Sequence, residues 1–229
     1  DMDALPIQEA TGLPWASERP GVAHACGHDG HMAVLLGTAR LLSERREELA
    51  GNVRFIFQPG EEGYGGAQRM VQEGCLQDPP VNCIFAFHGV SALPAGHVEL
   101  SLTPYATMRG VRVLVRGRGG HGAYPHTTRD PIAAAAQIVV AAQTIVSREL
   151  APAEPGVLSF GTIHGGTAGN IIPDQVELRG TIRAMASDVA AHIYDSLERI
   201  AEDVARATRT EALVSDVCEY PPAVCDEEL

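Results

Sequence analysis

The chain has 229 residues, with 17 Lys or Arg against 29 Asp or Glu, and its net charge of −12 argues against a nucleic-acid surface. No apolar run approaches the roughly 20 residues that span a bilayer, and no basic-then-apolar leader marks a signal peptide. A hydrophobic fraction of 45% is typical of a globular protein, and five cysteines, an odd set, fit a reducing compartment, so we expect a cytoplasmic location without a membrane partner.

The first half of the chain alternates short apolar runs with amphipathic segments. The expected elements are a strand end at 1–6, a loop at 10–30, a helix at 31–49, a strand at 53–57, a helix at 66–73 and a strand at 82–87. Met32, Leu35, Leu36, Ala39 and Leu42 mark the apolar side of the first helix. The order predicts an α/β domain with a largely parallel sheet over residues 1–105.

The second half has a different order of elements. We expect a strand at 111–116, a Gly-rich loop at 117–122, a helix at 130–150, strands at 157–164 and 175–184, a helix at 187–208 capped by Ser187, and a strand at 211–218. Asp130 and Pro131 are typical of a helix N-cap and first turn. The β-α-β-β-α-β order predicts a ferredoxin-like α+β domain at 106–217, inserted in the larger domain, to which residues 218–229 return.

Residues 24–31 read His-Ala-Cys-Gly-His-Asp-Gly-His and hold three of the nine histidines. Imidazole, thiolate and carboxylate groups are ligands of zinc-type ions. Cys26 and His28 are too close in sequence to share a helix face, but in a Gly-rich turn both reach one cation. A plain loop with a buried Cys26, or a Cys–His nucleophile, is the alternative at this point.

Glu61, Glu62 and His88 each follow directly on an expected strand. Ligand sites in open α/β sheets form beyond the carboxyl ends of the strands, so the three side chains are expected at one edge. Two adjacent carboxylates indicate a division of labour, in which one holds metal and the other moves protons. Taken singly, Glu61 and Glu62 also fit the N-terminus of a helix, where acids are favoured. His88 alone also fits a packed residue at the end of a strand. Their joint placement favours a metal site over a Cys–His protease.

Five further polar residues are candidates. Asp1 and Asp3 form a strand-end Asp-x-Asp, a pattern in which the acid often orients a ligating histidine. His121 lies in the Gly-rich loop, Asn170 between two strands, and Arg183 on an apolar strand, where a charge needs a partner. From the residues alone, His121 also reads as a turn residue and Arg183 as an outward-facing charge.

Several phrases together resemble the two-domain metallo-amidohydrolases of the aminoacylase and carboxypeptidase G superfamily. They are DMDALPIQE, GVAHACGHDGHMA, RFIFQPGEEGYGGA, GRGGHGAYPH, DPIAAAAQIV and GNIIPD. The pair HACGHDGH and QPGEEG at this separation is very specific, and the likeness covers nearly the whole chain. The branch that it resembles contains hippurate hydrolases, N-acyl-amino-acid deacylases and plant auxin-conjugate hydrolases.

The resemblance implies a role for each matched residue. Cys26, His28, Glu62 and His88 match ligands of a pair of divalent ions, for which zinc, manganese, nickel and cobalt all suit the donors. Glu62 matches a ligand that bridges the two ions. Glu61 matches the general base that acts on the metal-activated water.

In the inserted domain, the resemblance makes His121 a lid residue that reaches the partner subunit's active site and steadies the oxyanion. Asn170 matches a lid residue near the substrate, and Arg183 matches a residue that meets a substrate carboxylate. Dimerisation through the lid is implied by the family alone. Other branches carry His-x-Asp where this chain has Asp1-Met-Asp3, which leaves the role of Asp1 open.

The family's last ligating histidine lies in the returning C-terminal part of the catalytic domain, and its first strands precede the DMDALP phrase. We therefore expect the chain to be a fragment lacking both ends of that domain. The expected activity is metal-dependent hydrolysis of the amide bond of N-acyl amino acids, with Glu61 as base. The alternatives are a dipeptidase or carboxypeptidase of the same superfamily, and a truncated, non-catalytic homologue.

Overall fold

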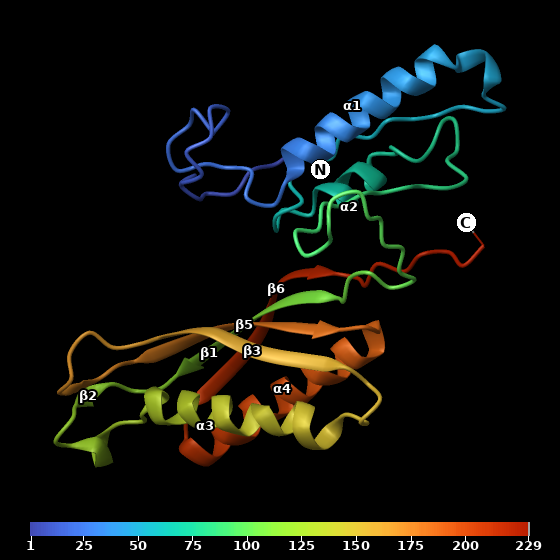
Figure 1. The fold of residues 1–229 in the computed structure, drawn as a ribbon. Coiled ribbons are helices and arrows are strands. Elements are labelled where there is room, and N and C mark those ends of the chain that lie inside the picture. Colours follow the sequence, from blue (N-terminus) through green and yellow to red (C-terminus); the bar gives the residue numbers. More distant parts are fainter. Residues whose placement is uncertain (229) are drawn as a thin grey trace. The chain divides into compact units, whose positions relative to one another are not determined.

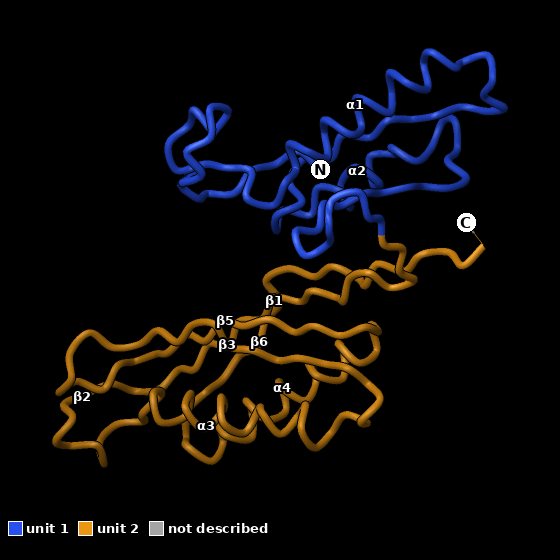
Figure 2. Tube along the Cα trace, viewed as in Figure 1, with its two compact units in different colours: residues 1–98 blue, residues 99–229 orange. Residues whose placement is uncertain are grey.

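The structure is a computed structural model that describes residues 1–228. The chain divides into two compact units, Asp1–Val98 and Glu99–Leu229, which Figure 2 shows in different colours. The sequence places the corresponding boundaries at residues 105 and 217. The assignment of these parts as catalytic domain, lid and returning segment stays a prediction.

The first unit contains two α-helices joined by long connections (Figure 1). These are α1 (His28–Glu44) and α2 (Gly66–Gln72), with a short 3₁₀ helix, η1 (Arg46–Glu48), between them. Gly27 precedes α1 in the left-handed region at φ 76°, a conformation that glycine adopts without steric cost. Asp29 in the first turn complements the positive end of the helix dipole. α1 therefore starts three residues earlier than expected.

The expected strands at 53–57 and 82–87 are not strands in the structure. Within residues 1–98, all of which are described, the one strand-like pairing is an antiparallel bridge between Leu5 and Ala23. A strand is defined by hydrogen bonds to a neighbour, and no segment of this unit pairs with either run. Ile84 and Phe85 are accordingly 64% and 77% exposed. The parallel sheet is thus not seen in this unit.

The apolar side of α1 is partly as expected. Met32, Leu35, Ala39 and Leu42 are half-buried, whereas Leu36 is exposed. Leu36 differs because it lies one position beyond Leu35, about 100° further round the helix, and nothing in this unit covers that side. The buried residues of α1 are instead His28 and His31, in its first turn.

The second unit is a four-stranded antiparallel sheet with two helices. Its elements are β1 (Met108–Arg116), β2 (Gly120–His121), the 3₁₀ helix η2 (Pro125–Thr127), α3 (Pro131–Thr144), the π-helix η3 (Ile145–Glu149), β3 (Gly156–His164), β4 (Ile171–Ile172), β5 (Gln175–Ala184), α4 (Ser187–Thr208) and β6 (Glu211–Tyr220). The strand order is β3-β5-β1-β6, and β2 and β4 form a separate two-stranded ribbon. The main elements follow one another in the β-α-β-β-α-β order.

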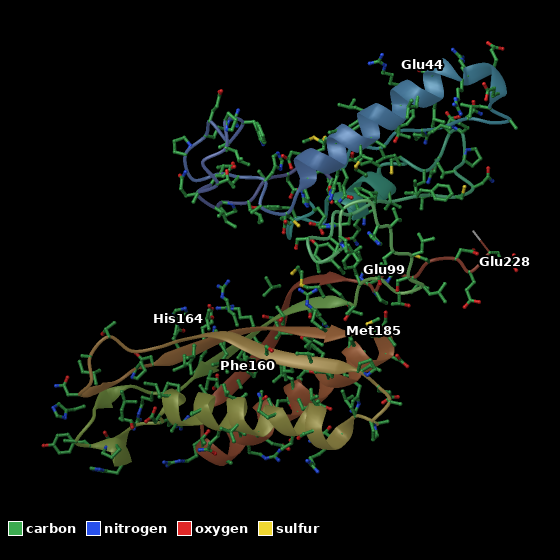
Figure 3. All side chains as sticks on the ribbon, viewed as in Figure 1. Glu44, Glu99, Phe160, His164, Met185 and Glu228 are labelled. Carbon is green, nitrogen blue, oxygen red and sulfur yellow. The ribbon has the colours of Figure 1, made fainter. Side chains whose placement is uncertain are left out.

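The core of this unit lies between the sheet and the helices α3 and α4, and Figure 3 shows side chains filling that space. Val113 of β1 pairs with Leu178 of β5 and with Val214 of β6. Val113 and Leu178 are fully buried, as are Ile138 of α3 and Leu197 of α4. Truncating a buried Ile or Leu to Ala costs about 2–5 kcal/mol, so this layer stabilises the unit strongly.

The two helices begin differently. Asp130 caps α3, and its carboxylate accepts hydrogen bonds from the backbone N–H of Ile132 at 2.8 Å and of Ala133 at 3.3 Å. The expected cap Ser187 is instead the first residue of α4, after an extended Ala186 that makes no side-chain cap. The serine is already helical, so its hydroxyl is not placed as an N-cap acceptor.

The segment Pro131–Glu149 is long and apolar enough to cross a membrane by length and composition. Its inner side nevertheless packs in the core, where Ala134, Ile138, Ala142 and Ile145 are fully buried. That packing is the behaviour of a core helix of the second unit.

Candidate metal centre

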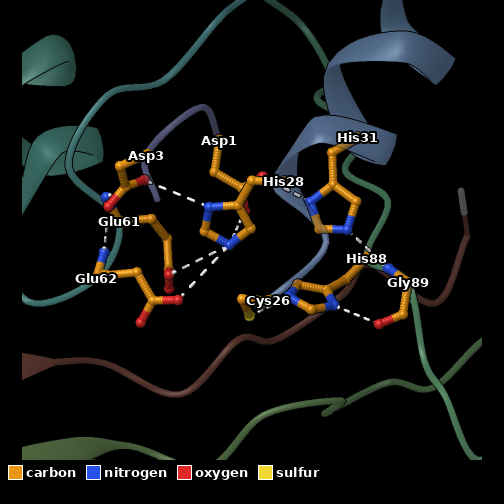
Figure 4. Close-up of polar contacts among 9 residues, drawn as sticks. All are labelled: Asp1, Asp3, Cys26, His28, His31, Glu61, Glu62, His88 and Gly89. Carbon is orange, nitrogen blue, oxygen red and sulfur yellow. Dashed lines mark hydrogen bonds and ion pairs between the residues drawn. The ribbon is translucent and has the colours of Figure 1, made fainter. Parts of the chain in front are cut away.

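Four segments of the first unit meet at the N-terminal end of α1 (Figure 4). They are the chain start with Asp1 and Asp3, the turn into α1 with Cys26, His28 and His31, the loop with Glu61 and Glu62, and the pair His88–Gly89. The residues expected at one edge are thus brought together, although the segments expected to carry them are not paired strands in the structure.

Asp3 joins two of these segments. Its Oδ1 accepts a hydrogen bond from the backbone N–H of Glu61 at 3.0 Å, and its Oδ2 accepts one from Glu62 at 2.9 Å. The same Oδ1 lies 3.4 Å from Nδ1 of His28. Burial opposes ionisation of Asp3, but the two backbone N–H groups outweigh it and lower its pKa. Asp3 is therefore a carboxylate that holds the backbone of the glutamate pair and lies next to the imidazole.

His28 turns its second nitrogen toward the acids. The side chain is 1% exposed, and neither ring nitrogen has a hydrogen-bond partner among the described residues. The oxygens nearest Nε2 are Asp1 Oδ2 at 3.5 Å, Glu61 Oε2 at 3.9 Å and Glu62 Oε1 at 3.9 Å. A buried imidazole without a hydrogen bond is costly, and a cation between Nε2 and these carboxylates would satisfy it.

Cys26 completes the cluster from the other side. Its Sγ lies 3.6 Å from Nε2 of His88, whose Nδ1 donates to the carbonyl oxygen of Gly89 at 2.8 Å. Burial raises the pKa of the Cys26 thiol, and the neighbouring Glu62 carboxylate raises it further. Burial and the neighbouring carboxylate thus favour the protonated thiol, whereas a bound cation would favour the thiolate that ligates metal.

The turn that presents the two glutamates has little space. The backbone N–H of Gly66 donates to the carbonyl oxygen of Gly60 at 3.1 Å and closes the loop. A Cβ at position 66 would lie 1.6 Å from the carbonyl oxygen of Pro59. Only glycine fits there, and α2 begins at that residue. The close approach fixes the path of the chain through Glu61 and Glu62.

The donor atoms form two overlapping groups. Cys26, His28 and Glu62 offer ligand atoms that all lie within 4.8 Å of one another, as do Asp1, His28, His31 and His88. Sulfur, imidazole nitrogen and carboxylate oxygen are the donors that zinc-type ions select. The imidazole of His28, which has no hydrogen-bond partner among the described residues, belongs to both groups. The donor types and this imidazole therefore fit a metal centre in which His28 is common to the two groups.

Asp1 and His31 have more contacts than the sequence indicates. Nδ1 of His31 lies 2.6 Å from Oδ1 of Asp1, and Nε2 of His31 accepts the backbone N–H of Gly89 at 2.8 Å. The sequence left the role of Asp1 open and gave none to His31. The available signal was spacing, since His28 and His31 are three apart and share a helix face.

The lid candidates lie in the second unit, where β2 and β4 bring two of them together. His121 pairs with Ile171, and the backbone N–H of Gly122 donates to the carbonyl oxygen of Asn170 at 2.8 Å. Nδ1 of His121 accepts the N–H of Ala123 at 3.1 Å, so the ring proton is on Nε2. The side chain is exposed, and His121 thus offers an N–H donor to solvent.

Arg183 does not join this pair. It is exposed on β5, nine residues beyond Asp174, whose carboxylate accepts the N–H of Gly119 in the His121 loop at 2.8 Å. Nine residues of strand span about 30 Å. In Figure 3, Met185 and His164 mark opposite ends of this sheet. An arginine at the far end of β5 is therefore not placed beside His121 in the same unit.

Comparisons with known proteins place the chain among metal-dependent hydrolases. The chain is 43% identical over 206 residues to an N-acetylcysteine deacetylase of Bacillus subtilis, a match that covers 90% of this chain and 54% of the relative. It is 41% identical over 235 residues to thermostable carboxypeptidase 1 of Saccharolobus solfataricus, covering 100% of this chain and 59% of the relative. The chain thus spans about half the length of the curated relatives it matches.

Among solved structures, the chain resembles a Bacillus subtilis protein described as a dinuclear metal binding peptidase of the M20 family. The TM-score is 0.78 at 37% identity, with 98% of this chain and 57% of the other covered. The model of peptidase family M20/M25/M40 matches residues 1–221. A match of the family model over almost the whole chain shows that the chain belongs to peptidase family M20/M25/M40.

Proposed function

We propose that the protein hydrolyses the amide bond of N-acyl amino acids with the help of two divalent metal ions. The observation that carries the proposal is the grouping of Cys26, His28 and Glu62, with the carboxylate of Glu61 beside the same imidazole nitrogen. The relative named as an N-acetylcysteine deacetylase supports the class of substrate.

The ligands that we assign are Cys26, His28, Glu62 and His88. Zinc, manganese, nickel and cobalt all accept this mixture of sulfur, nitrogen and oxygen donors. When bound, such ions act as Lewis acids and lower the pKa of a coordinated water to about 7. Asp3 holds the backbone of Glu62 in place for this task, and its other oxygen lies 3.4 Å from the ring of His28.

Glu61 moves the proton in this proposal. Its side chain is 47% exposed and within 3.9 Å of Nε2 of His28, so it is open to substrate and next to the ligands. The carboxylate takes a proton from the attacking water and returns it to the leaving amine. A base whose backbone is held by Asp3 needs little rearrangement between these two steps.

His121 donates its Nε2–H to the oxygen of the amide carbonyl as negative charge develops there. We propose that it does so in the active site of the partner subunit of a homodimer, with Asn170 near the substrate. Within the described residues, β3 and β6 are the edge strands of the sheet and available for pairing with a second copy. Arg183 as a contact for the substrate carboxylate stays a prediction.

Two expectations on architecture also remain proposals. The apolar runs at 53–57 and 82–87 would lie in the parallel sheet of a catalytic domain, which agrees with the exposure of Ile84 and Phe85 in the first unit. The second unit would act as the lid over the substrate. The cytoplasmic location likewise stays a prediction.

A carboxypeptidase or dipeptidase activity is the second candidate, favoured by the relative named thermostable carboxypeptidase 1. The two activities share a site and differ in what lies on the acyl side of the scissile amide. Amino-acid release by the intact protein from N-acetyl amino acids, hippurate and dipeptides, with manganese or zinc, separates them. We expect the N-acyl amino acids to be the faster substrates. Release from dipeptides alone would favour the carboxypeptidase, and no release from a metal-loaded protein would contradict both.

A further inference from the structure

His31 lies among the candidate ligands, yet both of its ring nitrogens are engaged in the protein. The side chain is 7% exposed. Nε2 accepts the backbone N–H of Gly89 at 2.8 Å, and a backbone N–H has no other role than donor. Nδ1 lies 2.6 Å from a carboxylate oxygen of Asp1, so Nδ1 carries the ring proton and donates it. His31 is thus held as the neutral Nδ1–H tautomer.

The hydrogen bonds continue to the proposed ligand His88. The peptide group of Gly89 that donates to His31 also accepts, through its carbonyl oxygen, from Nδ1 of His88 at 2.8 Å. That donation puts the lone pair of His88 on Nε2, the nitrogen that lies 3.6 Å from Sγ of Cys26. Through its contact with Gly89, His31 therefore supports the hydrogen bond that sets the tautomer of the proposed ligand His88.

At its other end, His31 holds Asp1. One carboxylate oxygen of Asp1 accepts from Nδ1 of His31, and the other lies 3.5 Å from Nε2 of His28. The imidazole of His31 thus contacts both the segment that carries Asp1 and the segment that carries His88 and Gly89. The rings of His31 and Phe87 pack at a centroid distance of 5.9 Å with their planes nearly perpendicular, at 84°.

We propose that His31 is a positioning residue of the metal centre and not one of its ligands. It aligns His88 through Gly89 and turns one oxygen of Asp1 toward the metal-facing nitrogen of His28. A ligating imidazole needs a lone pair, and the single lone pair of this tautomer is occupied by the N–H of Gly89. Proximity alone would place His31 among the ligands, since it groups with Asp1, His28 and His88. The inference rests on the metal centre of the proposed function.

Three substitutions separate the two contacts. In His31→Asn, an amide nitrogen replaces the Nδ1 donor to Asp1, and in His31→Gln, an amide oxygen replaces the Nε2 acceptor for Gly89. His31→Phe removes both contacts and keeps a ring. We expect the metal dissociation constant of the intact protein to rise about 10–100-fold in the Phe variant, with the same number of ions bound at saturation. Asn and Gln should each recover part of the loss, and the exposed His97→Gln is the matched control.

The readout that does not depend on any variant is nuclear magnetic resonance of the ¹⁵N-histidine-labelled intact protein loaded with ¹¹³Cd²⁺. We expect ¹¹³Cd–¹⁵N couplings to His28 and His88, none to His31, and a proton on Nδ1 of His31 before and after loading. A coupling to His31, or an Nε2–H tautomer, would overturn the positioning role while leaving the metal centre intact. Absence of coupling to every histidine would remove the metal centre and, with it, this inference.

Discussion

The backbone N–H of Glu62 donates to a carboxylate oxygen of Asp3 at 2.9 Å, across 59 positions of sequence. The other oxygen of Asp3 accepts from Glu61 and faces Nδ1 of His28. One acid therefore fixes the glutamate pair relative to the imidazole. This arrangement explains how a loop without strand partners keeps the candidate ligands within reach of one another.

Replacing Asp3 by Asn should weaken the metal centre without changing any ligand. An amide has one oxygen in place of two, so its NH₂ group would face an N–H of Glu61 or Glu62. We expect metal affinity to fall about 10–100-fold, as for other groups that orient ligands. Isothermal titration of the metal-free intact protein with Zn²⁺ measures this, with the surface variant Asp203→Asn as control. Unchanged affinity in the Asp3 variant would show that the loop holds its shape without it.

Gly66→Ala should disrupt the loop that carries the glutamates. The added Cβ would lie 1.6 Å from a backbone carbonyl oxygen, and neither group can move without opening the turn. We expect loss of metal binding and a lower melting temperature. Gly37→Ala is the matched control, because nothing lies within 4 Å of its Cβ and it sits within α1, where Ala is favoured by about 1 kcal/mol. Equal behaviour of the two variants would contradict the account of the turn.

His121→Ala tests the oxyanion donor. Removing one such donor costs about 10²–10³-fold in kcat, and we expect KM and metal content to change little. The exposed neighbour His126→Ala should leave kcat unaltered. Steady-state kinetics with an N-acetyl amino acid give the comparison. An effect of His121→Ala confined to KM would point to substrate binding in place of charge stabilisation.

Glu149 should make the second unit sensitive to acid. Its carboxylate accepts from Arg199 at 2.8 Å and from the hydroxyl of Ser196 at 2.9 Å, and the Arg199 guanidinium above all holds the pKa of Glu149 below its ordinary value of 4.5. The folded chain thus binds fewer protons than the unfolded chain just below that value, so stability rises with pH there. The contribution, about 1 kcal/mol, is fully present above the ordinary pKa and is lost as the pH falls through the lowered one.

Urea unfolding of the wild type and of Glu149→Gln between about pH 7 and about pH 3 checks this. The difference in the free energy of unfolding between the two proteins should be constant above about pH 5 and shrink below it. A difference that grows on acidification would reverse the sign of the argument.

The second unit could be predicted from sequence almost element by element because its signals are local. Asp130 and Pro131 are a favoured N-cap and first-turn pair and start α3 here, and the alternating Val111, Val113 and Val115 indicate one buried face. Runs such as 82–87 have strand composition, but a strand also needs a hydrogen-bonding neighbour. Composition alone carries no information on whether that neighbour is present.

The candidate site shows the same limit. Residue type and spacing indicated Cys26, His28 and the glutamate pair as candidates, since their chemistry is visible in the sequence, and the structure brings them close together. The engagement of both nitrogens of His31 depends on Asp1 and Gly89, which are 30 and 58 positions away. Contacts of this kind exist only after folding. In the sequence, a histidine that positions ligands therefore cannot be distinguished from one that binds metal.

Titrating the metal-free intact protein with Mn²⁺ or Zn²⁺, while following both bound metal and amino-acid release from an N-acetyl amino acid, tests whether hydrolysis depends on the metal centre and on Glu61. Glu61→Gln is measured alongside, with the exposed Glu48→Gln as control. We predict that release rises with metal to about two ions per chain, and that Glu61→Gln binds the same amount but releases amino acid at least about 10²-fold more slowly. Release without metal, or full activity of Glu61→Gln, would contradict the account.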